Sequence, residues 1–552
     1  MITPTAALKD TEGTRARMGG LEKSACKSVE KQENHENGPR WSWARNQTGN
    51  PRLNRKCQFQ KGNMKRHPLL LIAACSMLFI FTATATVHYV GLNCTNPVPP
   101  YTNWTTAATN IQDAVDAATN GDLVLVTNGV YATGGRMWFD SGTNRVILTN
   151  TITLQSVNGP AVTFIVGSQV AGTGYAVRCV GMGNNAVLSG FTLTNGEAGS
   201  GNYPDGGGVA SIDGPGTVTN CVLIGNSATN NAGGGAYRVT LINCQIIGNY
   251  ASDGGGTCAC TLVNCTLVSN TATSGGGVYG GVFGTCLLTN CTIVRNAASS
   301  SGGGVNGGGK GVMNNCVIYC NTAPSGSNYT GINMNYCCTT PLPTSGMGNF
   351  TNAPLFLNPT NGDFHLQSNS PCINSGNNAY VTTTTDLDGN PRIVGGTVDM
   401  GCYEYQTPAS IISYAWLQQY GLPTDGSVDF ADLDGNGMNV YQDWIAGLNP
   451  TNAASVLALQ APAATNTTGI TVTWQSVSGI TYFLQSSTNL SASPAFTTIQ
   501  SNLVGQAGTT SYTDTKATNG GPYFYRVGVP NRRGMCRVVV LVYCLKGSSP
   551  ES

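Results

Sequence analysis

The sequence predicts an all-β protein, in which a parallel β-helix solenoid is followed by a linker with a calcium loop and by a small C-terminal β-sandwich. Three observations predict this fold class. A unit rich in glycine, asparagine and cysteine recurs through the middle of the chain. A twelve-residue segment rich in aspartate, asparagine and glycine lies farther along the chain, and segments that alternate polar and apolar residues follow it.

The composition narrows the class of protein. Glycine accounts for 72 of the 552 residues, and charged residues make up only 10%. Low charge excludes a nucleic-acid-binding protein, because neutralising phosphates requires clustered Lys and Arg. Glycine without a strict period of three excludes collagen, and 40% hydrophobic residues argue against wholesale disorder.

The N-terminal part differs from the rest. Residues 1–63 are rich in charge, and we interpret them as a mispredicted or disordered extension. Residues 64–85 combine a basic start, an apolar run from Leu69 to Phe81 and small residues up to Ala85, which is typical of a secretory signal peptide. The alternative is a cytoplasmic tail with a signal anchor. We expect a secreted or cell-surface bacterial protein whose mature chain has no transmembrane span.

The repeat lies between residues 206 and 321, within the predicted solenoid of residues 86–349. Each unit reads Asn-Cys-x-x-x-x-Asn and alternates with Gly-Gly-Gly. The cysteines are Cys221, Cys244, Cys265, Cys291 and Cys316, and the closing asparagines are Asn226, Asn249, Asn270, Asn296 and Asn321. Three glycines per unit exclude a helical solenoid, so each unit is predicted to be one coil of short strands stacked on the next.

Stacking predicts ladders of equivalent side chains. The asparagines should form a corner ladder that exchanges amide hydrogen bonds along the axis. The cysteines should form an interior ladder of buried, mostly reduced thiols, because parallel Cβ positions about 4.8 Å apart exceed the usual separation in a disulfide. At the start of the solenoid, Ile111, Ala114, Val115 and Ala118 have helical spacing and predict an N-terminal capping helix.

Several motifs resemble known families. The segment 111–131 looks like the opening of right-handed β-helix proteins of the pectin-lyase-like superfamily, and the repeat is similar to polymorphic outer-membrane-protein repeats. Residues 350–405 resemble the choice-of-anchor Q domain, which ends such β-helices. The motifs that carry this likeness are Pro354-Leu355-Phe356, Gly362–Leu366, Ser370–Ile373, Asp386–Arg392 and Asp399–Glu404. The resemblances imply a right-handed coil and export, whereas the superfamily includes lyases, hydrolases and adhesins.

The linker, residues 406–455, contains the predicted calcium loop. Its oxygen donors fit the spacing of a twelve-position loop, with Gly437 at the sharp turn. The predicted ligands are Asp432, Asp434, Asn436, Met438 through its carbonyl, and Asp443. The loop looks like those of dockerin and thrombospondin type 3 repeats, and we expect a structural role for calcium. The alternative is a solvated Asp/Asn turn without metal.

The C-terminal module, residues 456–530, alternates with period two at 470–474, 481–485 and 523–527, which predicts strands. It resembles a small fibronectin-type-III-like sandwich. Residues 531–552 follow as an atypical tail with four basic residues and two cysteines.

Two functions fit this organisation. The favoured one is a binding, adhesion or structural module whose partners are extracellular glycans or other cell-surface components. The alternative is a polysaccharide lyase or glycoside hydrolase. Its weak catalytic candidates are Asp205 and Asp253, which precede equivalent glycines two coils apart, about 9.6 Å by strand spacing. Aspartate before glycine is chiefly a turn residue, so the sequence favours binding over catalysis.

Overall fold

The computed structural model describes residues 85–138, 142–169, 176–198, 205–211, 213–281, 284–460, 469–518, 521–530 and 538–545. The predicted extension at 1–63 and, apart from Ala85, the predicted signal peptide at 64–85 lie outside the described residues. In the described part, no helix is both long enough and apolar enough to cross a bilayer.

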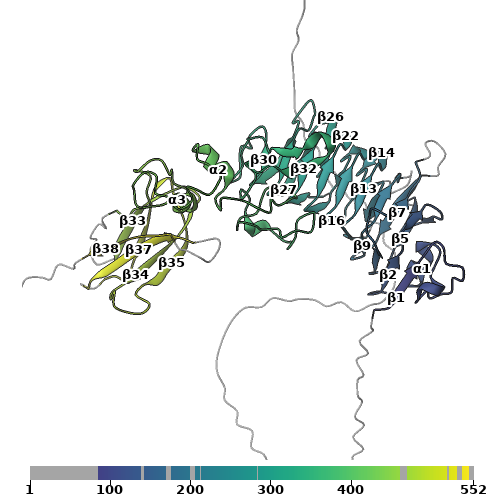
Figure 1. Ribbon diagram of the computed structural model, residues 1–552, viewed down its shortest axis with the longest axis horizontal. Helices are drawn as coiled ribbons and strands as arrows, with labels where there is room; N and C mark the ends of the chain where they lie inside the picture. The colour runs from purple at the N-terminus through teal and green to yellow at the C-terminus, as the bar shows by residue number, and fades with distance from the viewer. Residues whose placement is uncertain are drawn as a thin grey trace, which may run out of the picture. The chain divides into compact units, whose positions relative to one another are not determined.

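The middle of the chain is the predicted right-handed parallel β-helix, whose short strands stack coil upon coil (Figure 1). The largest sheet contains β1 (Val87–Val90), β2 (Leu123–Val126), β4 (Arg136–Met137), β5 (Thr143–Leu148), β6 (Thr153–Ser156), β8 (Val177–Met182), β9 (Val187–Ser189), β11 (Val209–Ser211), β12 (Thr217–Thr219), β15 (Ala236–Tyr237), β16 (Thr240–Ile242), β19 (Thr257–Cys258), β20 (Thr261–Val263), β23 (Val278–Tyr279), β24 (Leu287–Thr289), β27 (Val305–Asn314) and β29 (Tyr329–Asn335).

Two further parallel sheets complete the coils. The second contains β3 (Gly129–Tyr131), β7 (Thr163–Val166), β10 (Thr192–Thr194), β13 (Val222–Ile224), β17 (Gln245–Ile247), β21 (Thr266–Val268), β25 (Thr292–Val294), β28 (Val317–Tyr319) and β30 (Cys338–Thr339). The third contains β14 (Ser227–Ala232), β18 (Tyr250–Asp253), β22 (Thr271–Ser274) and β26 (Ala297–Ser301). The antiparallel hairpin of β4 and β5 departs from the parallel pattern.

The asparagine before each ladder cysteine forms a corner of the coil. Asn220, Asn243 and Asn264 have φ of 52°, 53° and 51°, and Asn290 and Asn315 repeat this conformation. Asparagine tolerates the left-handed region better than other residues with a Cβ. The first residue of the repeat therefore turns the chain from one sheet into the next.

The glycine triplets are required by close packing of the backbone. A Cβ on Gly207 would lie 2.0 Å from the carbonyl oxygen of Ser227, and a Cβ on Gly255 would lie 2.2 Å from that of Thr271. Glycine is the residue that permits so close an approach between neighbouring coils.

Both predicted ladders are present. The five closing asparagines are buried and hydrogen-bonded in series along the axis. The five cysteines are free thiols inside the core. Burial raises the pKa of Cys265, Cys291 and Cys316 well above the usual range, so these thiols remain protonated and act as small apolar residues.

The first coils carry the predicted helix, α1 (Ile111–Ala117). Asn110 caps its N-terminus by accepting a hydrogen bond from the Asp113 amide, and Ile111, Ala114 and Val115 are buried. A short 3-10 helix, η1 (Trp104–Thr106), precedes it.

Residues 350–405 pack against the side of the last coils. This segment contains β31 (Phe356–Asn358), η2 (Pro359–Asn361), β32 (Asp363–Leu366) and η3 (Asn378–Tyr380). Phe356 and Phe364 share a buried cluster with Val294 and Val317, which lie on coil strands β25 and β28. Asn315 accepts a hydrogen bond from the Asn377 amide at 2.8 Å and fastens the segment to a coil corner.

The linker and the C-terminal module follow. The linker holds α2 (Tyr414–Gln419) and α3 (Val440–Ala446). The sandwich pairs β33 (Ile470–Ser476) with β36 (Gly508–Asp514), and its second sheet has the order β35 (Thr497–Val504), β34 (Thr481–Ser487), β37 (Tyr523–Val529) and β38 (Val538–Leu545). Trp474 is fully buried between them. Strand β38 lies within residues 531–552, which the composition had indicated to be a tail outside the sandwich. It pairs with β37 and so extends the second sheet.

Candidate functional site

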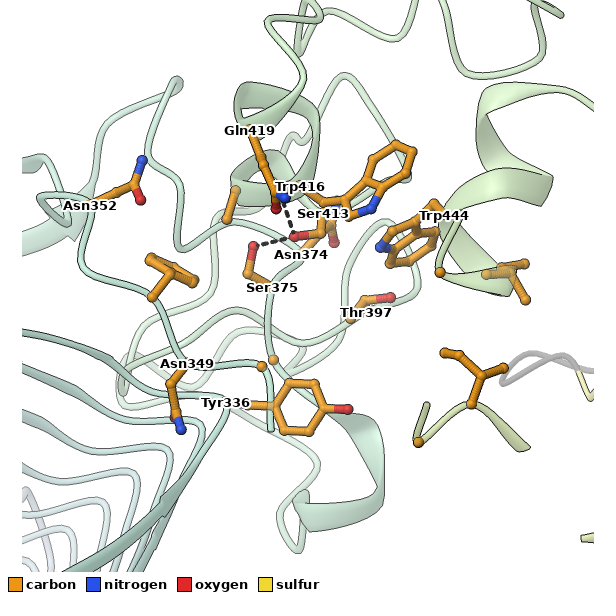
Figure 2. Close-up of a pocket in the computed structure, with 18 of the residues that line it drawn as sticks. Tyr336, Asn349, Asn352, Asn374, Ser375, Thr397, Ser413, Trp416, Gln419 and Trp444 are labelled. Atoms are coloured by element: carbon orange, nitrogen blue, oxygen red, sulfur yellow. Dashed lines mark hydrogen bonds between the residues drawn. The ribbon is translucent and has the colours of Figure 1, made fainter. Parts of the chain in front are cut away.

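A pocket of about 830 Å³ lies where the end of the solenoid meets the two linker helices (Figure 2). The labelled side chains around it are Tyr336, Asn349, Asn352, Asn374, Ser375, Thr397, Ser413, Trp416, Gln419 and Trp444. Aromatic rings, amides and hydroxyls line the pocket, and within the described part of the chain none of its lining side chains is charged.

Two tryptophans from different helices supply apolar surface to the pocket. Trp416 lies on α2, and its ring packs edge-on against Tyr420 at 4.9 Å between centroids. Trp444 lies on α3, where its ring is 5.9 Å from that of Tyr441. Both tryptophans are half-buried, so part of each ring remains available to a ligand.

Helix α2 is anchored from its first residues. Ser413 caps it by accepting a hydrogen bond from the Trp416 amide, and its hydroxyl lies 2.7 Å from that of Ser375 (Figure 2). The Tyr414 hydroxyl accepts a hydrogen bond from the Ala409 amide at 2.9 Å. Leu417 is buried in the linker core. These contacts fix the helix that carries Trp416, whose side chain packs against the linker core and also lines the pocket.

Asn374 brings a polar atom without a partner to the wall. Its Nδ2 donates to the Ser410 carbonyl at 2.8 Å, whereas its buried Oδ1 accepts no hydrogen bond. The backbone of Asn374 is in the left-handed region, and its amide donates to Asp399 Oδ1 at 2.7 Å. An unsatisfied buried acceptor costs about 1–3 kcal/mol. Asn374 has no exposed surface, so it supports the wall of the pocket from behind.

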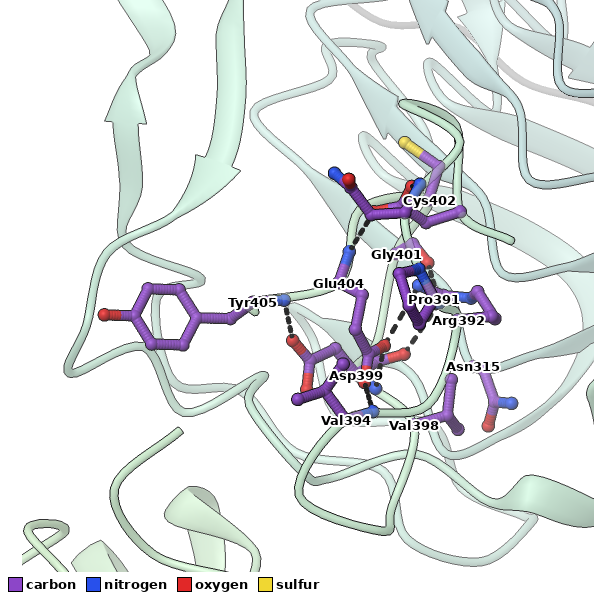
Figure 3. A network of polar contacts seen from close by, with 12 residues as sticks. Asn315, Pro391, Arg392, Val394, Val398, Asp399, Gly401, Cys402, Glu404 and Tyr405 are labelled. Carbon is purple, nitrogen blue, oxygen red and sulfur yellow. Dashed lines mark hydrogen bonds and ion pairs between the residues drawn. The ribbon is translucent and has the colours of Figure 1, made fainter. Parts of the chain in front are cut away.

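The carboxylate that holds the Asn374 amide belongs to a buried ionic network (Figure 3). Arg392 Nη1 pairs with Glu404 Oε2 at 3.1 Å, and both side chains are almost inaccessible. Glu404 also accepts hydrogen bonds from the Val394 and Asp399 amides. Burial raises the pKa of Glu404 and of Asp399. The charged residues of the 386–404 motifs thus build the scaffold behind the pocket and do not face it.

The predicted catalytic candidates lie on the coils, outside this pocket. Asp205 Oδ1 accepts a hydrogen bond from the Ala232 amide at 3.0 Å, and Ala232 pairs with Asp253 on the next strand. The two aspartates are therefore two coils apart, as the spacing predicts. Burial raises the pKa of both, and the charge of Asp205 adds to the effect on Asp253. Neither lines the pocket or a smaller hollow of about 250 Å³ beside Arg238.

The predicted calcium ligands are brought near one another by the loop and by α3. Asp432 accepts hydrogen bonds from the Gly435 and Gly437 amides, each at 2.9 Å. Burial, then the charges of Asp434 and Asp432, raise the pKa of Asp443 to about 7. In the described structure, however, no three His, Cys, Asp or Glu residues form a ready-made metal cluster. Asn436 Oδ1 accepts a hydrogen bond from the Met438 amide at 2.8 Å.

The sequence interpretation missed the pocket. Trp416, Trp444, Tyr336 and Asn374 are widely separated in the chain, and only their fold brings them together. It also missed His365, whose ring nitrogens lie 2.6 Å from Asp363 and from Asp388. Ser413, directly before the first residue of α2, could have indicated where this helix begins, because serine favours helix N-caps.

No protein-family model matches the chain, and no curated protein matches it. Solved structures with a similar fold include pectate lyase Pel9A, with a TM-score of 0.37 and 15% identity over 58% of this chain and 96% of that one. A rhamnogalacturonan lyase has a TM-score of 0.27 and 11% identity over 56% and 89% of the two chains. The tailspike protein gp49 of Acinetobacter baumannii bacteriophage Fri1, a capsular polysaccharide depolymerase, has a TM-score of 0.25 and 10% identity. The match covers 83% of this chain and 78% of the tailspike chain. These low scores carry no argument about activity.

Proposed function

We propose that this protein is an exported bacterial β-helix protein that binds an uncharged glycan in the pocket between Trp416 and Trp444. The pocket's lining supports this proposal: half-buried aromatic rings, amides and hydroxyls surround a cavity in which no described side chain is charged. Sugars present apolar C–H faces and rings of hydroxyls, and binding sites for them need both kinds of surface. Export rests on the signal-peptide pattern of residues 64–85.

The exposed amide side chains of Asn352 and Gln419 give the pocket hydrogen-bonding groups. Each amide can both donate and accept. Because sugars carry many hydroxyls, they suit such groups better than a hydrocarbon ligand would.

The uncharged lining of the pocket favours neutral glycans over acidic ones. A polymer of uronic acids carries a carboxylate on each sugar, and burying that charge requires a positively charged partner. Among the residues that the structure describes, no Lys or Arg lines the pocket. We therefore propose neutral hexose polymers as the ligand class, in preference to pectate-like acidic polymers.

Titration of the full chain with soluble polysaccharides tests this proposal. The panel contains neutral glucans, mannans and galactans beside polygalacturonate, and calorimetry measures the heat of binding. We expect binding to at least one neutral polymer and none to polygalacturonate. Binding to polygalacturonate alone would contradict the assignment of the pocket.

A second candidate function is hydrolysis on the coils, favoured by the register that places Asp205 and Asp253 two coils apart. A separation of about 9.6 Å lies near the range of inverting glycosidases, 6.5–9.5 Å. The test is release of reducing ends from the same panel. Activity that disappears in both Asp205→Asn and Asp253→Asn would replace the binding proposal by this one.

A further inference from the structure

The linker loop carries an uncompensated negative charge that the proposed glycan site does not use. Asp443 is 1% exposed, and its Oδ1 has no hydrogen-bond partner. Asp432 and Asp434 of the same loop are also acidic. A buried carboxylate without a positive partner is costly, so this arrangement calls for a cation.

The donor set identifies the kind of cation. The predicted ligands of the loop offer carboxylate, amide and backbone carbonyl oxygens, with no imidazole or thiolate among them. Oxygen ligands suit calcium and magnesium, and an irregular loop suits calcium better because magnesium demands near-ideal octahedral geometry. Gly435 and Gly437 have φ of 74° and 89°, conformations that allow the loop to fold tightly beside Asp443.

We propose that the loop binds one calcium ion through Asp432, Asp434, Asn436, the Met438 carbonyl and Asp443, and that this ion holds α3 and its tryptophan in place at the glycan pocket. The second part of the proposal rests on the proposed function. With the cation present, the three carboxylates no longer repel one another, and Asp432 and Asp434 can close onto Asp443.

Helix α3 provides the connection between the ion and the pocket. Asp443 and Trp444 are consecutive residues of α3, and Trp444 lines the pocket. Val440 and Tyr441 of the same helix share a buried cluster with Leu417 of α2. A ligand that fixes Asp443 therefore acts on both helices that carry the pocket's tryptophans.

Calcium chloride titrated into the metal-free full chain tests the ion site without any glycan. We expect binding heat and a rise of a few degrees in the melting temperature at saturating calcium. Asp443→Asn and the exposed-site variant Asp432→Asn should each lower the calcium affinity at least tenfold. Asp425→Asn is the matched control, because Asp425 is an exposed aspartate of the same linker that caps Ser427. Calcium binding that is absent in wild type, or unchanged in both loop variants, would overturn the proposal.

The connection to the pocket is tested by titrating the neutral glycan in calcium and in chelator. We expect at least tenfold weaker binding in chelator for wild type, and no effect of chelator for Asp432→Asn. If calcium binds but glycan affinity is the same in both buffers, the connection is overturned. If calcium binds and no neutral glycan binds in either buffer, the proposed function fails while the ion site stands.

Discussion

Asn249 Oδ1 accepts two hydrogen bonds from the asparagine of the preceding coil, one from the Asn226 amide at 2.9 Å and one from Asn226 Nδ2 at 3.0 Å. The same pair of bonds joins Asn249 to Asn270. Each Nδ2 also donates to a strand carbonyl, as Asn249 does to Leu223. The repeated asparagine therefore satisfies a buried corner of the backbone on every coil.

Asn270 lies in the middle of this ladder, and its replacement by alanine should be among the most destabilising changes at a corner. Asn270→Ala removes the acceptor for the Asn249 amide and the donor to the Ile246 carbonyl, and it leaves those buried groups unpaired. We expect a loss of about 3 kcal/mol or more in the free energy of unfolding. Chemical denaturation measures it, with the surface variant Asn231→Ala as control. Equal stability of the two variants would contradict the role of the ladder.

The thiols should differ sharply in their reactivity. The described cysteines are free, and most are buried; Cys320 is exposed and Cys94 is half-buried. In the native protein, a thiol reagent should label Cys320 first and Cys94 more slowly, and it should leave Cys221, Cys244 and Cys265 unlabelled. Mass spectrometry of labelled peptides before and after denaturation measures this. Disulfides among the ladder cysteines would contradict the stacked arrangement.

His365 should make stability depend on pH. Burial lowers its pKa, but the hydrogen bonds to Asp388 and Asp363 outweigh burial and raise it. Its charged form is therefore stabilised by folding, a contribution that is complete below the unfolded pKa of about 6.5 and is lost as pH rises through the raised folded pKa.

The measurement compares wild type with His365→Gln at pH 5.5 and pH 9. We expect the variant to be less stable by up to about 1 kcal/mol at the lower pH, a small value because the side chains are 41% exposed. The difference should shrink at the higher pH. A difference that grows with pH would contradict the arrangement around His365.

Two ion pairs of the chain should differ in their effect on stability. Arg392 and Glu404 are buried, whereas Arg136 and Asp116 are exposed. Arg392→Met leaves the Glu404 carboxylate buried without a positive partner and should lower the free energy of unfolding by about 3–5 kcal/mol. Arg136→Met should cost less than about 1 kcal/mol. Parallel denaturation of both variants tests this, and similar losses would show that the network of Figure 3 does not stabilise the fold more than an exposed ion pair does.

The solenoid could be predicted because each of its features is local and repeated. In each Asn-Cys-x-x-x-x-Asn unit the first asparagine forms a left-handed corner, the cysteine points into the core and the last asparagine joins the ladder. The same pattern recurs on successive coils, so it can be recognised in the sequence. Asn220 shows the corner and Cys221 the interior position. The capping helix and the sandwich strands also depend on local periodicity.

The pocket could not be predicted in the same way. Tyr336, Asn374, Trp416 and Trp444 have no common spacing, and each is an ordinary residue in its own segment. Their assembly depends on how residues 350–405 pack beside the coils, which involves long-range contacts such as that of Asn377 with Asn315. The strand Val538–Leu545 was not predicted for a different reason. The basic residues around it differ in composition from the module before them, so the whole segment was interpreted as a tail.

Glycan binding by the two tryptophans of the pocket can be measured by calorimetric titration of the neutral polymer. The proteins compared are wild type, Trp416→Ala, Trp444→Ala and the control Trp104→Ala, whose exposed ring packs against Tyr89 on the first coils. We predict that each pocket variant loses at least tenfold in affinity and that Trp104→Ala binds as wild type does. Unchanged affinity in both pocket variants, or an equal loss in Trp104→Ala, would contradict glycan binding at Trp416 and Trp444.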